Sequence, residues 1–283
     1  MKVLVIGKRG YIAESFVKYA TTKYELDVKI IDSRSAWKTE PFENYNTIIV
    51  AAGIAHRRQT KENKHLYYEV NRDLALAIAN KAKAANVGHF IYLSSMSVYG
   101  IKQGEITKDT IPNPANNDYY GHSKHEAELL LKELESEHFK IAIIRPPMVY
   151  GKNCPGKFSQ LLGLSKFLFL LPDTNNKRSI IYIDNLCEFL YKTTINQEQG
   201  IFCPQNGELA NTGHIIKLIR LCSSKSTIIL PLLSAPFKLA MTLCPPLKNA
   251  FSSLYYTPEK SDYQIFNLKE SIYSLCSKTI NEE

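Results

Sequence analysis

Short, mostly apolar runs alternate with longer amphipathic stretches through the first half of the chain. The runs cover residues 2–6, 26–31, 47–50, 90–93 and 141–144. Such a run is typical of a strand that is buried on both faces of a parallel sheet. Between the runs, apolar residues follow helical spacing over residues 14–21, 69–85 and 120–137. The alternation predicts an α/β fold with a doubly wound parallel sheet.

The pattern changes after residue 151. An apolar stretch over residues 158–171 leads into a polar loop over residues 173–178 and a further strand over residues 179–183. We therefore expect a first domain over residues 1–155, to which a strand from residues 179–190 contributes. A smaller, partly interleaved region covers residues 156–283, and its residues from 262 onward are expected to be helical before the end frays.

The most membrane-like stretch is residues 228–247, and it is a poor spanning helix. Lys238 and four prolines interrupt it, at positions 231, 236, 245 and 246. A spanning helix needs about 20 predominantly apolar residues, and an interior proline breaks a helix. We expect packed segments of the second region, with a peripheral membrane contact as the alternative. The first residues run straight into a strand pattern and do not resemble a signal peptide.

The cysteine content indicates the redox compartment, and the charge content limits the classes of binding partner. Six scattered cysteines without Cys-x-x-Cys or metal-ligand spacing predict a reduced, cytoplasmic protein without a metal site. The net charge of +8, from 35 basic and 27 acidic residues, suits an anionic small molecule, a membrane surface or nucleic acid. Because the basic residues are spread out and form no known motif, we do not expect a nucleic-acid partner.

The first strand leads directly into Gly7-x-x-Gly10-x-x-Ala13, and a helix follows. Small residues let the backbone approach a pyrophosphate, and the helix N-terminus supplies N–H groups and the positive end of a dipole. The stretch that includes Arg9, Tyr11 and Ile12 is therefore expected to bind the phosphates of a dinucleotide. The spacing differs from Gly-x-Gly-x-x-Gly, so a plain tight turn is the alternative.

An acidic residue ends the second strand. Asp32 lies about 20 positions beyond the glycine loop, where a dinucleotide fold binds the adenosine ribose hydroxyls. This position favours NAD, whereas Arg9 and Arg34 could bind the 2′-phosphate of NADP. Alternatively, Asp32 caps the following turn.

Other candidate residues lie at strand ends and helix starts. Ala51-Ala52-Gly53 lets the end of the third strand approach a flat ligand, and Ser94-Ser95 places hydroxyls where α/β sheets bind ligands. Asn71, early in a helix, is a cap or local hydrogen-bonding residue unless it joins a proton relay. The loop residues His56, Arg57 and Arg58 either meet an anionic substrate or are solvated.

Tyr120 and Lys124 are four residues apart in a predicted helix, which places both side chains on one face. A lysine ammonium beside a phenol favours the phenolate and lowers the phenol pKa toward a catalytically useful range. Such pairs are common on ordinary surface helices, so the interpretation depends on the other motifs.

The motifs follow one another in a specific order: Gly7-x-x-Gly10-x-x-Ala13, Asp32, Ala51-Ala52-Gly53, Asn71, Ser94-Ser95-x-x-Val98-Tyr99-Gly100, Tyr120-x-x-x-Lys124 and Arg145-Pro146 to Gly151. Together they resemble the extended short-chain dehydrogenase/reductase family, in particular its nucleotide-sugar epimerases, dehydratases and ketoreductases. The resemblance covers roughly residues 1–220. It implies a Rossmann-type domain over residues 1–155 that binds NAD or NADP, and a region over residues 156–283 that mainly binds the nucleotide sugar.

The resemblance gives roles to individual residues. It implies that Tyr120 is the acid-base catalyst, that Lys124 lowers its pKa and holds the nicotinamide ribose, and that Ser95 is the catalytic hydroxyl. The expected cofactor residues are Gly7, Arg9, Gly10, Tyr11, Ile12, Asp32, Arg34, Ala51, Ala52, Gly53, Asn71, Tyr120, Lys124 and Pro147. The expected substrate residues are Ser95, Ser97 and Arg178, of which the last matches a family position that often contacts the substrate diphosphate.

One departure from the family pattern narrows the reaction. Family 4,6-dehydratases have an Asp-Glu pair directly after the catalytic hydroxyl, where this chain has Met96 and Ser97. Dehydration is therefore not expected, and redox chemistry at C4 of a hexose on a nucleotide, with UDP favoured, remains. A 4-ketoreductase would reduce a C4 ketone once, with NADP favoured as cofactor. A 4-epimerase, the alternative, would oxidise the C4 alcohol and then reduce the ketone again, with NAD as cofactor.

The chain length, short for a family 4-epimerase, and the pair Lys8-Arg9 in the glycine loop favour the ketoreductase. A dinucleotide sensor without catalysis is a remote alternative. The family further implies the synthesis of surface-polysaccharide precursors, and its members are often homodimers.

Overall fold

The computed structural model describes residues 1–55, 57–115, 118–244, 248, 250–258 and 267–277. His56, the end of the 228–247 stretch and the final residues expected to fray lie outside this range. Contacts divide the chain into two units. Unit 1 comprises Met1–Gly100, Asp109–Pro146 and Leu186–Pro204, and unit 2 comprises Ile101–Lys108, Pro147–Asn185 and Gln205–Glu283.

Unit 1 is built on a six-stranded parallel sheet in the order β10-β6-β4-β3-β1-β2. Its strands are β1 (Lys2–Ile6), β2 (Asp27–Ile31), β3 (Thr47–Val50), β4 (His89–Leu93), β6 (Lys140–Ile144) and β10 (Gly200–Phe202). The central strands β3 and β4 are buried along their whole length, which explains their continuous apolar runs. The predicted α/β class and doubly wound parallel sheet are confirmed.

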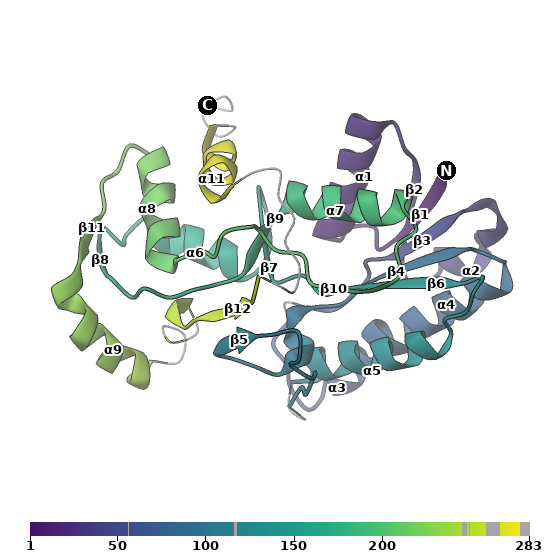
Figure 1. Cartoon of the computed structure of the whole chain (residues 1–283), viewed down its shortest axis with the longest axis horizontal. Helices are drawn as coiled ribbons and strands as arrows, with labels where there is room; N and C mark the ends of the chain where they lie inside the picture. Colours follow the sequence, from purple (N-terminus) through teal and green to yellow (C-terminus); the bar gives the residue numbers. More distant parts are fainter. Residues whose placement is uncertain (56, 116–117, 245–247, 249, 259–266, 278–283) are drawn as a thin grey trace. The chain divides into compact units, whose positions relative to one another are not determined.

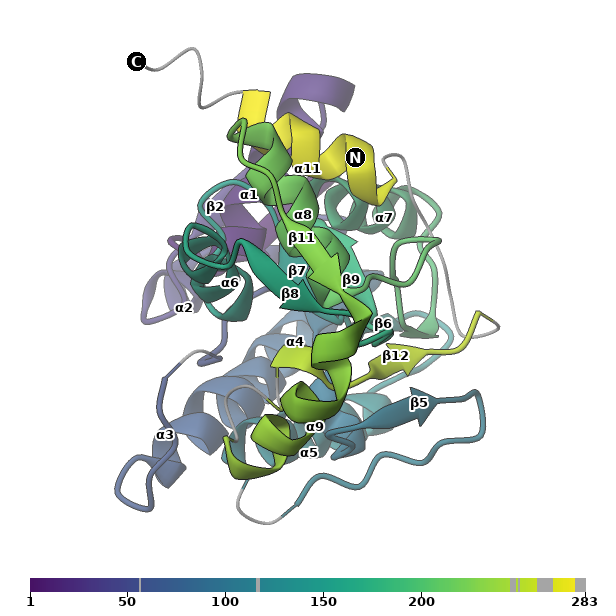
Figure 2. The same cartoon turned by 90° about the vertical axis from the view of Figure 1, so that its left-hand side faces the viewer.

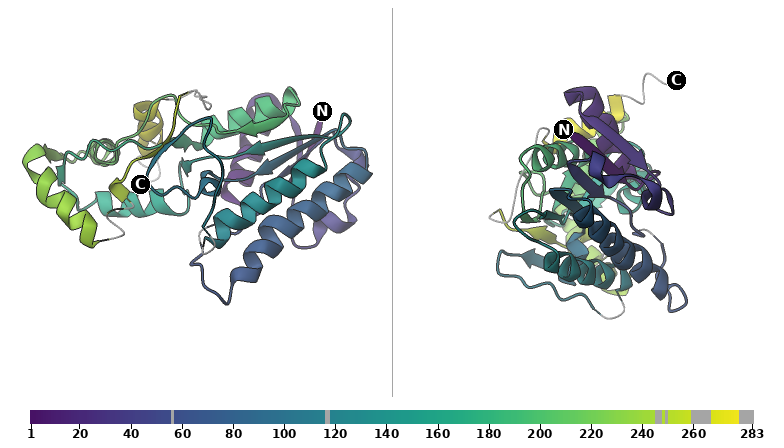
Figure 3. Two further views of the ribbon diagram at one scale, coloured as in Figure 1. Left: turned by 60° about the horizontal axis from the view of Figure 1, so that its bottom comes forward. Right: turned by 90° about the vertical axis from the view of Figure 1, so that its right-hand side faces the viewer.

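Helices cover both faces of this sheet (Figure 1). On one face lie α1 (Tyr11–Tyr24) and α7 (Ile183–Ile195), where the Tyr24 and Tyr191 rings stack with centroids 3.7 Å apart. On the other face α4 (Leu74–Ala84) and α5 (Tyr119–Glu133) run side by side (Figure 3). The shorter helical segments are α2 (Ala36–Thr39), η1 (Phe42–Asn44), α3 (Lys64–Tyr68), the π-helical turn η2 (Glu69–Asp73) and η3 (Met96–Tyr99).

The core under α4 explains why an alanine-rich helix forms there. Ile78, Ala79 and Ala82 are fully buried and belong to one apolar cluster with Ile48 and Phe90 of the sheet. Small side chains allow the helix to lie close to the strands, and alanine has the highest helix propensity.

The strand order reverses at β1, because the chain passes from β1 to β2 on one side and then to β3 on the other. The carboxyl ends of β1 and β3 are therefore neighbours. The backbone N–H groups of Ala51 and Ala52 both donate to the carbonyl oxygen of Ile6, over 3.0 and 3.1 Å. Ligands of doubly wound sheets bind at such a reversal point, and two predicted cofactor segments meet here.

The expected strand contribution from residues 179–190 differs in the structure. The strand β9 (Ile180–Tyr182) pairs with β7 (Met148–Tyr150) in a separate two-stranded sheet, and α7 follows it directly. The sixth strand of the central sheet is β10 instead. Gly200 and Phe202 are partly buried and Ile201 is exposed, so β10 lacks the buried, continuous apolar run that marked the other strands.

The described residues of unit 2 form three two-stranded sheets and several helices, which Figure 2 shows from the side of β8 and β11. The pairs are β5 (Gly104–Ile106) with β12 (Leu254–Tyr256), β7 with β9, and β8 (Leu170–Pro172) with β11 (Ile228–Leu230). The helical segments are α6 (Lys157–Ser165), α8 (Thr212–Cys222), η4 (Pro231–Leu233), α9 (Ser234–Leu243) and α11 (Leu268–Ser277).

The stretch over residues 228–247 forms β11, η4 and α9 as far as it is described, because Pro231 ends the strand and opens the 3-10 turn. Among the described residues, no helix has the length and apolar character to span a bilayer.

Candidate active site

The catalytic candidates meet at the carboxyl end of β4 in unit 1. Ser95 follows this strand and caps η3 by accepting a hydrogen bond from the backbone N–H of Ser97 over 3.1 Å. Tyr120 lies in the first turn of α5, which Asp118 caps by accepting from the backbone N–H of Gly121. A Cβ at Gly121 would lie 2.7 Å from the carbonyl oxygen of Ser97, so its lack of a side chain lets α5 approach η3. The Ser95 hydroxyl lies close enough to the Tyr120 phenol to lower its pKa.

Lys124 lies one helical turn after Tyr120 and is almost fully buried. Its Nζ donates a hydrogen bond to the carbonyl oxygen of Leu93 over 2.6 Å and lies 4.5 Å from the centre of the Tyr92 ring. A Cβ at Gly53 would be 3.2 Å from this Nζ and 3.1 Å from Oδ1 of Asn71. The structure therefore brings Gly53, Asn71 and Lys124 together, although they are far apart in the sequence.

The pKa shifts of Tyr120 and Lys124 differ from the expectation that Lys124 lowers the pKa of Tyr120. Burial of the phenol raises the pKa of Tyr120, and Asp118 adds to this, while the nearby Ser95 hydroxyl opposes it. Burial also lowers the pKa of Lys124 to about 7, against a smaller opposing effect of Glu128. Because the amine loses much of its charge at neutral pH, it cannot strongly favour a phenolate. Desolvation outweighs the charge attraction that the spacing suggested.

Asn71 is a bridging residue rather than a helix cap. It lies in the π-helical turn η2 and is fully buried. Its Oδ1 accepts from the backbone N–H of Ile54 over 2.9 Å, and its Nδ2 donates to Oγ of Ser123 over 3.0 Å. The residue thereby joins the loop after β3 to the helix that carries Tyr120 and Lys124. Single π-helical turns are frequent at functional sites.

The glycine loop has the close packing that a phosphate-binding turn needs. Gly7 has φ of +139°, and a Cβ there would lie 2.9 Å from the backbone nitrogen of Ala52. The helix α1 begins after Gly10 without a side-chain cap. Its first N–H groups, which include those of Tyr11 and Ile12, are the ones that bind anions at helix N-termini. The backbone N–H of Arg9 donates to Oε1 of Glu14 over 3.0 Å.

Asp32 forms the turn cap that was the alternative to ribose binding. Its Oδ1 accepts from the backbone N–H of Arg34 over 2.7 Å. A carboxylate has a second oxygen and several lone pairs, so the cap is compatible with a ribose contact. Arg9 and Arg34 have exposed side chains.

A buried ion pair behind Lys124 was not predicted from the sequence. Glu128, one turn after Lys124, accepts from Nε and Nη2 of Arg145 over 3.0 and 2.5 Å. Arg145 also donates from Nη1 to the Tyr99 hydroxyl over 2.8 Å, and the Ser94 hydroxyl donates to Glu128. Burial raises the pKa of Glu128, but the neighbouring His125 ring and the hydrogen bonds from Arg145 outweigh it, so the pKa is lowered. The four-residue spacing from Lys124 to Glu128 was the available signal.

Pro147 and Arg178 belong to unit 2, and their assignment to cofactor and substrate stays a prediction. Arg178 lies where the chain bridges to Ala210 and Leu254, and its Nη1 donates to the carbonyl oxygen of Ser252 over 2.9 Å. Burial lowers the pKa of its guanidinium group.

The side-chain clusters of the described residues include no group of three or more His, Cys, Asp or Glu that could hold a metal ion. Arg57 and Arg58 are exposed in their loop.

The fold and the order of these motifs are those of the extended short-chain dehydrogenase/reductase class. Residues 3–201 match the model of the NAD dependent epimerase/dehydratase family. The chain belongs to this family, which confirms the predicted resemblance.

Relatives within the family share C4 chemistry in their names. The chain is 31% identical to UDP-glucose 4-epimerase of Vibrio cholerae over 238 residues, which cover 79% of this chain and 72% of the relative. It is 25% identical to N-acetyl-alpha-D-glucosaminyl-diphospho-ditrans,octacis-undecaprenol 4-epimerase of Escherichia coli O157:H7 over 210 residues, or 66% of this chain and 61% of the relative. Its fold is similar to that of UDP-glucuronic acid 4-epimerase from Bacillus cereus, solved with NAD, with a TM-score of 0.74, 17% identity and 99% coverage of each chain.

Proposed function

We propose that this protein is an NAD(P)-dependent 4-epimerase of a nucleotide-linked hexose. The observation that carries the proposal is the meeting of Ser95, Tyr120 and Lys124 at the carboxyl end of β4, with Lys124 one turn after Tyr120 along α5. Two of the curated relatives are named for 4-epimerisation of a hexose joined to a diphosphate, which supports reaction at C4.

Tyr120 moves the proton in this proposal. Its pKa is raised by burial, so the phenol is protonated at neutral pH. Epimerisation requires the phenol to release this proton first, then to take the proton of the C4 hydroxyl during oxidation and return it to the C4 oxygen during reduction. The Ser95 hydroxyl is near the phenol and would orient the same oxygen. Lys124 has a pKa of about 7, so it can exchange a proton with its surroundings near neutral pH.

The cofactor supplies the hydride acceptor and donor. The residues present fit a dinucleotide, because the glycine loop brings the backbone close to the reversal point and α1 begins without a side-chain cap. Gly7, Gly10, Tyr11 and Ile12 would hold the diphosphate. The lack of a side chain at Gly53 keeps the approach to Lys124 and Asn71 open for the nicotinamide end.

Residues outside the glycine loop and α5 would contact the cofactor ribose and the substrate diphosphate. Asp32 would bind the adenosine ribose through the carboxylate whose Oδ1 caps the turn at Arg34. Arg178 would meet the substrate diphosphate, because a guanidinium group whose pKa is lowered by burial is stabilised by a nearby anion. Met96 is almost fully buried and Ser97 is half-buried, and neither can supply the carboxylate that water elimination needs.

A 4-ketoreductase that uses NADPH is the second candidate. The observation that favours it is Arg9 in the glycine loop, with an exposed side chain next to the first turn of α1. Arg34 could contribute to the same 2′-phosphate site. The homodimer, the cytoplasmic location and the role in surface-polysaccharide synthesis stay predictions.

One experiment separates the two candidates. The purified protein is incubated with UDP-glucose and, separately, with UDP-N-acetylglucosamine, and C4 epimers are resolved by NMR while absorbance reports the reduced cofactor. An epimerase forms the C4 epimer without net use of cofactor. Stoichiometric oxidation of NADPH by a UDP-4-keto sugar, without epimer formation from either substrate, would contradict the epimerase and favour the reductase. In that case Arg9→Ala should weaken NADPH binding and leave NADH binding unchanged.

A further inference from the structure

Several large apolar side chains of unit 2 are exposed on neighbouring segments. We call the six most exposed of them the apolar face, and they are Phe167, Phe169, Ile228, Leu232, Leu239 and Leu243. Leu232 is 88% exposed and Phe167 is 77% exposed. Single exposed apolar residues are normal, but a contiguous group of them marks an interaction surface.

Contacts within unit 2 make these segments contiguous. The strands β8 and β11 pair in register, with Ile228 opposite Leu170, and the Ile228 backbone N–H donates to the carbonyl oxygen of Phe169 over 2.9 Å. The turn η4 follows β11 directly and leads into α9. Leu239 and Leu243 lie one turn apart and therefore on the same side of α9.

The strand pair is apolar on both sides, which a purely structural role does not require. In β8 and β11 the side chains alternate, so that Leu171 is buried while Leu170, Ile228 and Leu230 point outward and are exposed. A two-stranded sheet with one solvated face normally has polar residues at such positions. Here the outward positions have the same apolar character as the core.

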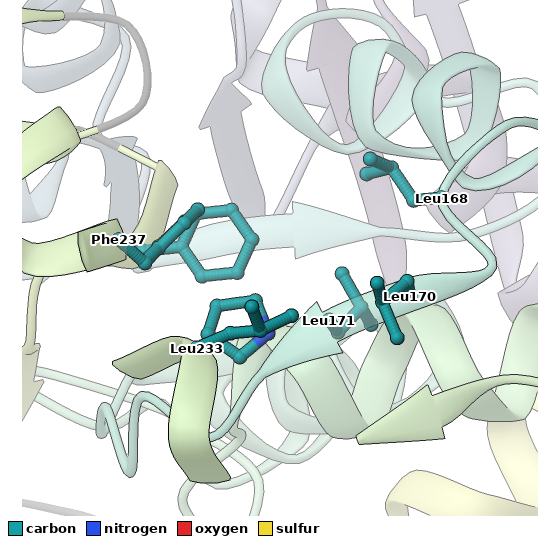
Figure 4. Close-up of a pocket in the computed structure, with 7 residues that line it drawn as sticks. Leu168, Leu170, Leu171, Leu233 and Phe237 are labelled. Atoms are coloured by element: carbon teal, nitrogen blue, oxygen red, sulfur yellow. The ribbon is translucent and has the colours of Figure 1, made fainter. Parts of the chain in front are cut away.

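A cavity of about 280 Å³ opens among the same elements. It is lined by Leu168, Leu170, Leu171, Pro172, Leu233, Phe237 and Phe251 (Figure 4). Pockets for polar small molecules contain a few polar groups that fix the ligand's orientation. The wholly apolar lining fits a hydrocarbon chain instead.

The charges on the segments that carry the apolar face are almost all positive. The sequence has no Asp or Glu over residues 157–172 or 209–258, whereas seven basic residues lie there, at positions 157, 166, 217, 220, 225, 238 and 248, of which Arg220 is buried. Lys166, next to Phe167, and Lys225, shortly before β11, are both exposed. Asp173, directly after β8, is an exposed acidic neighbour. A second copy of the chain would bring the same basic surface against itself, but anionic lipid headgroups would complement it.

We propose that the apolar face docks on the surface of a lipid bilayer that contains anionic lipids, and that the cavity accepts part of a lipid hydrocarbon chain. Leu232, Leu239 and Leu243 enter the boundary between headgroups and acyl chains, and Lys166 and Lys225 meet the headgroups. Interfacial binding of this kind combines buried apolar area with attraction to anionic lipid. The docking goes beyond the proposed reaction and does not depend on it.

The test measures co-sedimentation of the full-length protein with vesicles of phosphatidylcholine alone or with about 30 mol% phosphatidylglycerol. The docking variant combines Leu232→Glu and Leu239→Glu. The matched control combines Ile111→Glu and Ile195→Glu, which make the same charge change at exposed apolar positions of unit 1. We expect wild type and control to bind the anionic vesicles, and the docking variant to lose about tenfold or more in partitioning. Binding should weaken as salt rises from about 0.1 to 0.5 M.

Several results would overturn the proposal. One is failure of the wild type to bind anionic vesicles. A second is binding by the docking variant that equals binding by the wild type. A third is a wild type that binds no vesicles and is a dimer in light scattering, while the docking variant is a monomer. The last would mean that the face joins two copies. If the docking variant does not fold by circular dichroism, Leu232→Trp replaces it, and the introduced indole should shift its emission to the blue on anionic vesicles. An unshifted emission would also overturn the proposal.

Discussion

Nζ of Lys124 donates a hydrogen bond over 2.6 Å to the carbonyl oxygen of Leu93, the last residue of β4. This bond ties the predicted catalytic lysine to the end of a buried strand. It also keeps the amine in surroundings that lower its pKa to about 7. The position of the lysine is thus set by the sheet as well as by its own helix.

The lowered pKa of Lys124 should make stability depend on pH. In the unfolded chain the amine keeps its proton up to its ordinary pKa of 10.5, whereas in the folded chain it releases the proton at about 7. Between these values the unfolded chain binds more protons, so the free energy of unfolding rises with pH, by at most about 1.4 kcal/mol per pH unit. Between pH 7.5 and 9, denaturant unfolding of the wild type should therefore show this rise relative to Lys124→Met. Lys132→Met, at an exposed position of α5, should parallel the wild type. Parallel curves for Lys124→Met as well would mean that the pKa is not lowered.

Loss of the Tyr120 hydroxyl should abolish proton transfer with little effect on folding. We expect Tyr120→Phe to reduce kcat by about 10²- to 10⁴-fold, which is the usual contribution of general acid-base catalysis. Tyr119→Phe is the matched control, because it removes the same group from the preceding residue. The measurement is epimer formation by NMR at saturating substrate. Equal activity of Tyr120→Phe and Tyr119→Phe would remove Tyr120 from the mechanism.

Replacing one partner of the buried pair of Glu128 and Arg145 should lower the free energy of unfolding more than replacing both partners. Arg145→Met leaves the Glu128 carboxylate buried and without its cation, for which we expect a loss of about 3–5 kcal/mol in the free energy of unfolding. The double change to Met at both positions should cost less than Arg145→Met alone. Lys29→Met breaks an ion pair whose lysine is exposed and should cost about 1 kcal/mol or less. Denaturant unfolding at pH 7 checks the series, and a double variant less stable than the single one would contradict it.

Gly7 should not tolerate a side chain. Its φ of +139° is unfavourable for other residues, and a Cβ would lie 2.9 Å from the Ala52 nitrogen and 3.0 Å from the Ala51 carbonyl carbon. We expect Gly7→Ala to lose about 2–4 kcal/mol in the free energy of unfolding, from strain and overpacking. NAD(P) affinity should fall as well, measured by calorimetry on the folded fraction. Gly88→Ala, where a Cβ meets nothing within 4 Å, should change neither quantity.

The sequence located the central strands well because their signal is local. The strands β1 and β3 have the expected bounds, and β4 and β6 each begin one residue earlier. A strand buried on both faces must be apolar throughout, whatever its neighbours are. The three-residue strands of unit 2 leave no such signal, and the assignment of residues 179–190 to the central sheet was accordingly wrong.

The three candidate catalytic residues were predictable as a set, but their electrostatics were not. The family resemblance implied roles for Ser95, Tyr120 and Lys124, which stay predictions, and the structure brings Ser95 near the Tyr120 phenol. The direction of the Tyr120 pKa shift was not predictable. It depends on how much protein surrounds the phenol, and this comes from segments distant in the sequence.

By itself, the sequence determined the α/β class, the order of the motifs, the glycine turn and the four-residue spacing of Tyr120 and Lys124. These features follow from the periods of strands and helices and from glycine's freedom at positive φ. Only the tertiary structure decided which groups surround Lys124, that Glu128 meets Arg145, and that Leu232 is exposed while Leu171 is buried. Burial and desolvation are properties of the whole packed chain, so no local pattern contains them.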